Sequence, residues 1–138
     1  MDFQSAMATL NWLAVIVAAL SAFLIGGIWY SPATFGKAWM RENGFTEESI
    51  KQGNMGKIFG GTFALMLFAS FNLAMFLGPQ SDVASGGMAG FLAGFGWVAT
   101  MVGTHYLFER KSFTLFAINS GYSVVSLTIM GIILGIWK

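Results

Sequence analysis

The chain has 138 residues, of which 56% are hydrophobic and 9% are charged. Soluble domains carry roughly a quarter charged residues, so a chain with so little polar surface is expected in a lipid bilayer rather than in water. The formal net charge of +1 argues against a nucleic acid partner, and the absence of cysteine excludes a disulfide framework and thiolate chemistry.

Four apolar stretches are long enough to cross a membrane, because a hydrocarbon core of roughly 30 Å needs about 20 apolar residues in a helix. None of the four contains a proline or has a charge near its centre. The first lacks the basic start of a cleavable signal, so we expect it to be retained. The sequence predicts an all-α, polytopic membrane protein with a single domain over residues 1–138. The predicted spans are residues 10–30, 58–78, 86–108 and 113–137.

A short helix in the membrane interface is expected directly after the first span. Ser31 followed by Pro32 is typical of a helix start, with an N-cap and a proline at the first position. From there Phe35 and Trp39 share one face, as the apolar side of an interfacial helix does. The pattern predicts this interfacial helix over residues 32–43.

The distribution of Lys and Arg predicts the orientation in the membrane, because cytoplasmic loops are enriched in these residues. Six of them lie in the first and third loops, whereas the second loop and the N-terminus have none and the C-terminus has only Lys138. Both termini are therefore expected outside and these two loops inside. The six residues are Lys37, Arg41, Lys51, Lys57, Arg110 and Lys111.

With this orientation, three separate segments bring their most distinctive residues to the cytoplasmic level of the bundle. On the last span Asn119, Tyr122 and Ser123 follow a helical spacing and form a polar stripe. Such groups cannot face lipid without cost, so they must face another helix or a wet cavity. The candidate site residues are Trp29, Tyr30, Ser31, Trp39, His105, Glu109, Asn119, Tyr122 and Ser123.

The residue types available limit the chemistry of this site. His105 is the only histidine and there is no cysteine, so we expect no metal centre, no cofactor and no enzymatic activity. His105 is interpreted as a hydrogen-bonding partner of Glu109 or Tyr122, either structural or engaged in handling a proton or ligand, since its pKa lies near physiological pH.

Small residues at four-residue spacing occur on every span and allow close helix contact. More such faces are present than one four-helix bundle needs, so the sequence predicts a homo-oligomer with parallel subunits. The faces are Ala18, Ala22 and Gly26; Gly56 and Gly60; Gly86, Gly90 and Gly94; and Gly131 and Gly135.

Three motifs carry a resemblance to a known family: WYSPATFGKAW at 29–39, HYLFERKS at 105–112 and INSGY at 118–122. In their order and spacing they resemble domain-of-unknown-function family 1761, over essentially the whole chain. The resemblance implies a small bacterial four-helix protein of the inner membrane, and it implies no activity.

Two functions remain open at this stage. The first is a transporter, channel or small-ligand-binding protein with a cytoplasm-side polar cavity for a molecule or ion that the sequence does not identify. The second is a structural or accessory protein whose polar residues only hold helices together in the bilayer. Small multidrug exporters have a similar size but depend on an acid within the first helix, and residues 10–30 contain none.

Overall fold

The computed structural model describes residues 2–137, so Lys138, counted in the charge distribution, lies outside the described residues. This part of the chain is helical and contains no strand. Four helical segments are long and apolar enough to cross a membrane, which confirms the all-α membrane fold. They are α2 (Trp12–Trp29), α5 (Met55–Leu77), the continuous run α6 (Val83–Ala93), η1 (Gly94–Ala99) and α7 (Thr100–Glu109), and α8 (Phe113–Ile136).

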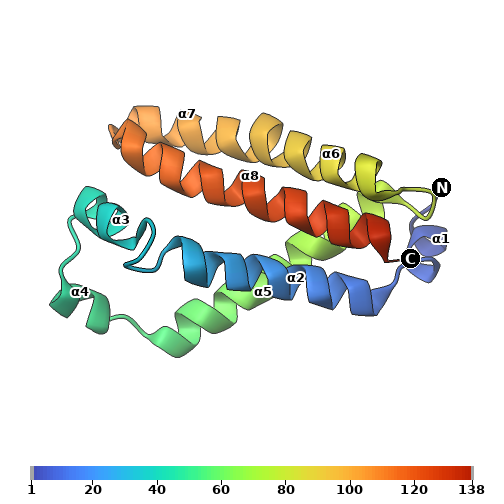
Figure 1. Cartoon of the computed structure of the whole chain (residues 1–138), viewed down its shortest axis with the longest axis horizontal. Helices are drawn as coiled ribbons and strands as arrows, with labels where there is room; N and C mark the ends of the chain where they lie inside the picture. Colours follow the sequence, from blue (N-terminus) through green and yellow to red (C-terminus); the bar gives the residue numbers. More distant parts are fainter. Residues whose placement is uncertain (1, 138) are drawn as a thin grey trace.

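Three short helices lie at the two ends of the bundle. At one end α1 (Phe3–Ala8), which was not predicted from the sequence, lies near both chain termini (Figure 1). At the other end α3 (Gly36–Asn43) and α4 (Glu47–Lys51) lie on the same side as the turn between α7 and α8. The predicted first and third loops therefore share one end of the molecule.

The helix that follows the first span begins at Gly36, and the prediction that it begins at Pro32 is wrong. Ser31 does not cap it, because the Ser31 hydroxyl donates a hydrogen bond of 2.8 Å to the carbonyl of Ile28. The Thr34 hydroxyl also donates to the carbonyl oxygens of Ile28 and Trp29. These side chains satisfy the last carbonyls of α2, so residues 31–35 form turns that end one helix before the next begins.

Glycine allows α6 and α8 to pack with their backbones in contact. A Cβ atom added to Gly86 would fall on the carbonyl oxygen of Gly131, and one added to Gly135 would fall on that of Asp82. The predicted small-residue faces of these two spans therefore serve packing within the chain. Close approach of this kind is how small residues associate membrane helices.

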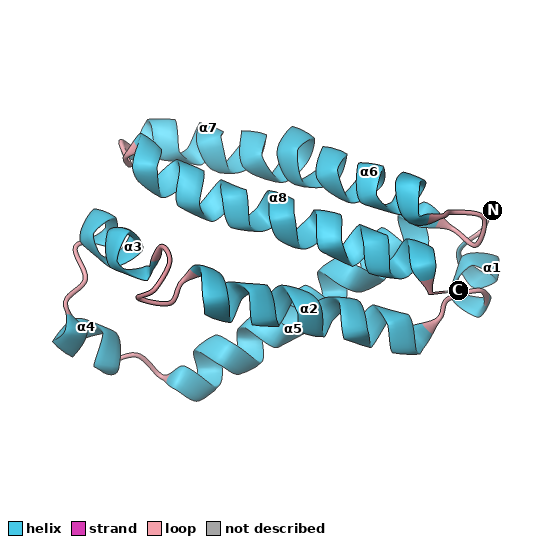
Figure 2. Cartoon of the chain, viewed as in Figure 1, coloured by secondary structure: helices cyan, strands magenta, loops and turns pink. Residues whose placement is uncertain are grey.

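The buried core lies toward the end that carries the termini, where α2, α5 and α8 meet. Ala14 and Ala18 of α2 have no exposed surface and pack with Leu73 of α5 and Met130 of α8. The Ser70 hydroxyl donates 2.8 Å to the carbonyl of Val15 within this core. The first half of α5 diverges from α2 toward α4 (Figure 2).

Candidate functional site

A hydrogen-bonded chain of side chains joins three helical segments at the end that carries α3 and α4. The Tyr30 hydroxyl, at the end of α2, donates to Asn119 Oδ1 of α8 at 2.7 Å. Asn119 Nδ2 in turn donates to the Tyr106 hydroxyl of α7, also at 2.7 Å. The amide of Asn119 thus uses its acceptor toward one helix and its donor toward another, and it fixes their separation.

A second pair of contacts holds α8 against α2. The Tyr122 hydroxyl donates 2.9 Å to the carbonyl of Ala22, beside Gly26, which leaves room for the ring. The indole N–H of Trp29 donates 2.9 Å to the carbonyl of Ile118. Buried Tyr and Trp side chains need such partners for their polar atoms, so both aromatics are satisfied by the backbone of a neighbouring helix.

A cavity of about 760 Å³ lies where the first half of α5 diverges from α2, next to α3 and α4. Tyr30 and Tyr122, which make the hydrogen bonds above, line it, together with Trp39 of α3. None of the described residues that line the cavity is Asp, Glu, Lys, Arg or His. The cavity is therefore largely apolar, with hydroxyl groups as its polar features, whereas a polar cavity was expected from the sequence.

Aromatic rings form one wall of this cavity. The ring of Tyr30 lies edge-on to Tyr122 at a centroid distance of 5.5 Å and to Trp39 at 5.8 Å. Trp39 continues the wall to Phe45, with ring centroids 5.3 Å apart. Edge-to-face pairs at these distances are attractive, so the wall links α2, α3 and α8 and holds its shape.

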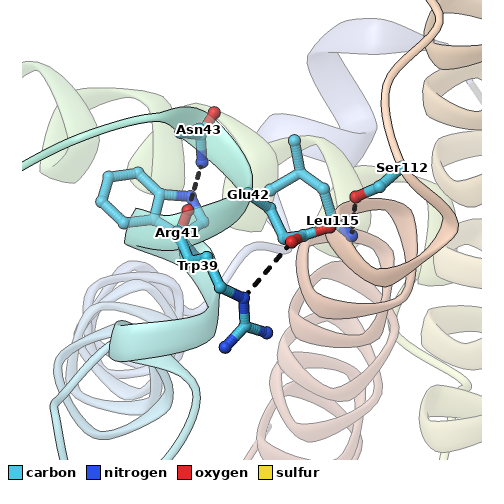
Figure 3. Close-up of polar contacts among 6 residues, drawn as sticks. All are labelled: Trp39, Arg41, Glu42, Asn43, Ser112 and Leu115. Carbon is cyan, nitrogen blue, oxygen red and sulfur yellow. Dashed lines mark hydrogen bonds and ion pairs between the residues drawn. The ribbon is translucent and has the colours of Figure 1, made fainter.

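The far end of α3 lies beside the start of α8, and each of the two segments has its own polar contacts there (Figure 3). Glu42 lies beside Ser112, whose hydroxyl caps α8 by accepting 3.0 Å from the backbone N–H of Leu115. Hydrogen bonding by the Ser112 side chain, assisted by the neighbouring Arg41, lowers the pKa of the Glu42 carboxyl. A carboxylate is favourable near a helix N-terminus, so the charge of Glu42 suits its place beside the start of α8.

Five of the nine candidate residues meet at this end, and four do not join them through side-chain contacts between helices. The hydroxyls of Ser31 and Ser123 donate to backbone carbonyls three and four residues earlier in the chain, those of Ile28 and Asn119. His105 and Glu109 are exposed on α7, and the side chain of neither forms a hydrogen bond or ion pair with another residue that the structure describes. The five that meet are Trp29, Tyr30, Trp39, Asn119 and Tyr122.

Tyr106, which was not among the residues selected from the sequence, takes the place expected for His105. The reason is η1, a π-helical segment in which hydrogen bonds span one residue more than in an α-helix. The face that packs on α8 contains Gly94 and then Ala99, five residues later, both buried. In a regular α-helix, the residue that faces α8 on the same side as Gly94 three turns later would be His105. The additional residue in η1 shifts this position by one, so Tyr106 faces α8 instead. Glycines at 94 and 96 are the only signal for this irregularity in the sequence.

Comparison with known proteins identifies one family. Residues 13–135 match the family described as "Protein of unknown function (DUF1761)", a range that includes every residue of the site described above. No curated protein and no solved structure matches the chain.

Proposed function

The chain belongs to the DUF1761 family of proteins of unknown function, and from its site we propose that this multi-pass membrane protein binds a small amphiphilic molecule in the cavity between α2 and α5. The observation that carries the proposal is the cavity itself: about 760 Å³, walled by aromatic rings and furnished with a few hydroxyls. Binding sites for small molecules are typically apolar pockets of about 300–1,000 Å³ with few polar groups.

The position of the cavity favours binding over conduction by a single protomer. Toward the termini the cavity ends at Phe23 of α2, and beyond it Ala14, Ala18 and Ala22 are fully buried against α5 and α8. A solute path would have to pass through this close-packed core. We therefore propose reversible binding as the basic activity, and transport only if the helices rearrange.

The competing proposal, a purely structural protein, leaves the cavity without explanation. If the polar groups served only to hold helices together, α5 would be expected to close on α2 along its whole length, as α6 does on α8. Asn119 and Tyr122 do hold helices together, and two of the tyrosines in these contacts, Tyr30 and Tyr122, also line the cavity. We propose no catalytic step, since His105, the only histidine, does not line the cavity.

We also propose that the protein lies in the bacterial inner membrane with both termini outside. Support comes from the six Lys and Arg residues at the end that carries α3, α4 and the α7–α8 turn, because such residues favour the cytoplasm. The cavity then opens toward the cytoplasmic leaflet. Labelling of a Glu48→Cys variant by an impermeant thiol reagent in intact cells would overturn this orientation.

Self-association as a parallel homo-oligomer is proposed through α5. A Cβ atom added to Gly60 would meet nothing within 4 Å, and one added to Gly56, one turn earlier, would meet only the side chain of Asn54. This small-residue face is thus free within the protomer, unlike those of α6 and α8. A mass corresponding to one chain in nanodiscs at several protein concentrations would contradict the proposal.

The binding proposal is tested by filling the cavity. Gly27 lines the cavity and has open space at its Cβ position, so Gly27→Leu places a side chain there without a backbone clash. Gly61→Leu is the matched control, because Gly61 is equally unobstructed and does not line the cavity. The probe is a long-chain alcohol with a terminal bromine, which quenches nearby tryptophan fluorescence in nanodiscs.

We expect saturable quenching in the unmodified protein. In Gly27→Phe or Gly27→Leu the affinity for the probe should fall by at least about tenfold, because the new side chain takes the space of the ligand. Gly61→Leu should bind as the unmodified protein does. Quenching that never saturates, or that responds equally to both leucine variants, would refute a binding site in this cavity.

A further inference from the structure

The hydroxyl groups of the cavity share one property: each has already donated its proton within the protein. Four residues with hydroxyl groups line the cavity. Three of these hydroxyls donate a hydrogen bond to a backbone carbonyl oxygen. The Tyr122 hydroxyl donates to Ala22, and the Thr62 hydroxyl donates 2.6 Å to Ile58. Since a carbonyl oxygen can only accept, the direction of these bonds is fixed.

The other two hydroxyls follow the same pattern. Ser49, in α4, donates 3.0 Å to the carbonyl of Thr46 and also accepts from the Thr46 N–H at 2.8 Å. Tyr30 donates to Asn119 Oδ1, and Asn119 Nδ2 in turn donates to Tyr106. A hydroxyl has one proton and two lone pairs, so each of the four retains only acceptor capacity toward the cavity.

The side-chain donors that remain are few. Trp39 is the one described lining residue with a side-chain N–H, and no lysine, arginine or histidine lines the cavity. A carboxylate or phosphate needs several donors or a positive charge to compensate for the loss of water, because burying an unpaired charge is far more costly than burying a hydroxyl. An anionic head group would therefore be poorly matched here.

We propose that the ligand is a single-chain amphiphile with an uncharged head group that donates a hydrogen bond, such as a primary alcohol, and that anionic amphiphiles are discriminated against. The inference rests on the proposed binding function and specifies its ligand class. The alkyl chain would lie against the apolar wall to which Phe23 and Phe59 contribute, whose rings pack edge to face, and the head group would donate to the lone pairs of the hydroxyls.

The test compares three bromine-terminated probes of equal chain length in nanodiscs: the primary alcohol, its methyl ether and the carboxylate. Dissociation constants are expressed per mole of lipid, so that partition into the bilayer cancels. The ether keeps the oxygen and loses the donated proton, so the alcohol should bind about three- to tenfold more tightly, the value of one hydrogen bond. The carboxylate should bind more weakly than both.

Variants of the cavity identify the acceptor. At least one of Tyr30→Phe, Ser49→Ala, Thr62→Val and Tyr122→Phe should reduce the preference for alcohol over ether to about unity. Thr128→Val is the matched control, because Thr128 also donates to a carbonyl of its own helix, at 2.7 Å, and does not line the cavity. Its preference should be unchanged.

The outcomes separate the two proposals. If none of the probes binds saturably, the binding function itself fails. If all bind saturably and the ether or the carboxylate equals the alcohol, the binding function stands and the inference about the head group is overturned. That inference is also overturned if the alcohol preference survives in all four cavity variants.

Discussion

At the scale of single residues, Asn119 is the junction of the candidate site. Its amide is the acceptor for Tyr30 and the donor to Tyr106, so that one side chain joins α2, α7 and α8. The polar stripe on the last span predicted that this residue faces inward. Its partners were not predictable, because the choice between His105 and Tyr106 depends on the π-helical turn in η1, and residue periodicity assumes a regular helix.

Replacement of Asn119 tests this role. Asn119→Leu removes both hydrogen bonds and leaves two phenol groups without partners, so we expect the free energy of unfolding to fall by about 1–2 kcal/mol. Asn72→Leu is the matched control, because Asn72 lies exposed on α5 and its side chain forms no hydrogen bond with another described residue. Unfolding in mixed detergent micelles measures both, and equal losses would show that Asn119 is not a junction.

At the scale of helices, composition predicted the elements well and their ends less well. The observed spans agree with the predicted ones to within a few residues. The start of the interfacial helix was misplaced because Ser31 has two possible roles, as the cap of a following helix or as a partner of preceding carbonyls, and the structure uses the second. Only the turn formed by Thr34 decides between them, and this turn has no simple sequence pattern.

The contact between α6 and α8 gives a second prediction. Gly131→Ala would place a methyl group on the backbone of Gly86 and push the helices apart, so we expect a loss of about 1–3 kcal/mol. Gly61→Ala makes the same change where a Cβ meets open space and outside the Gly56 and Gly60 face, so it should stabilise its helix by up to about 1 kcal/mol. Thermal unfolding in detergent compares the two, and a stabilising Gly131→Ala would contradict backbone contact between α6 and α8.

At the scale of the whole molecule, the low charge and the four apolar stretches were sufficient to predict a membrane bundle with both termini at one end (Figure 1). The cavity was expected to be polar, and the structure shows mainly aromatic and aliphatic walls. The sequence could not reveal this, because the cavity arises from the divergence of α5 from α2. Divergence depends on what fills the space between two helices, and periodicity carries no information about it.

The central claim is that an amphiphile occupies the space between α2 and the first half of α5, and photolabelling tests it most directly. A long-chain alcohol with a photoreactive group on its chain is equilibrated with the protein in nanodiscs, irradiated, and the modified peptides are mapped. The account predicts saturable labelling at Phe23, Phe59 and Trp39, suppressed by excess unlabelled alcohol. Labelling that excess alcohol does not suppress, and that is equally strong at Phe91 of α6 and Phe95 of η1, which are exposed away from the cavity, would contradict it.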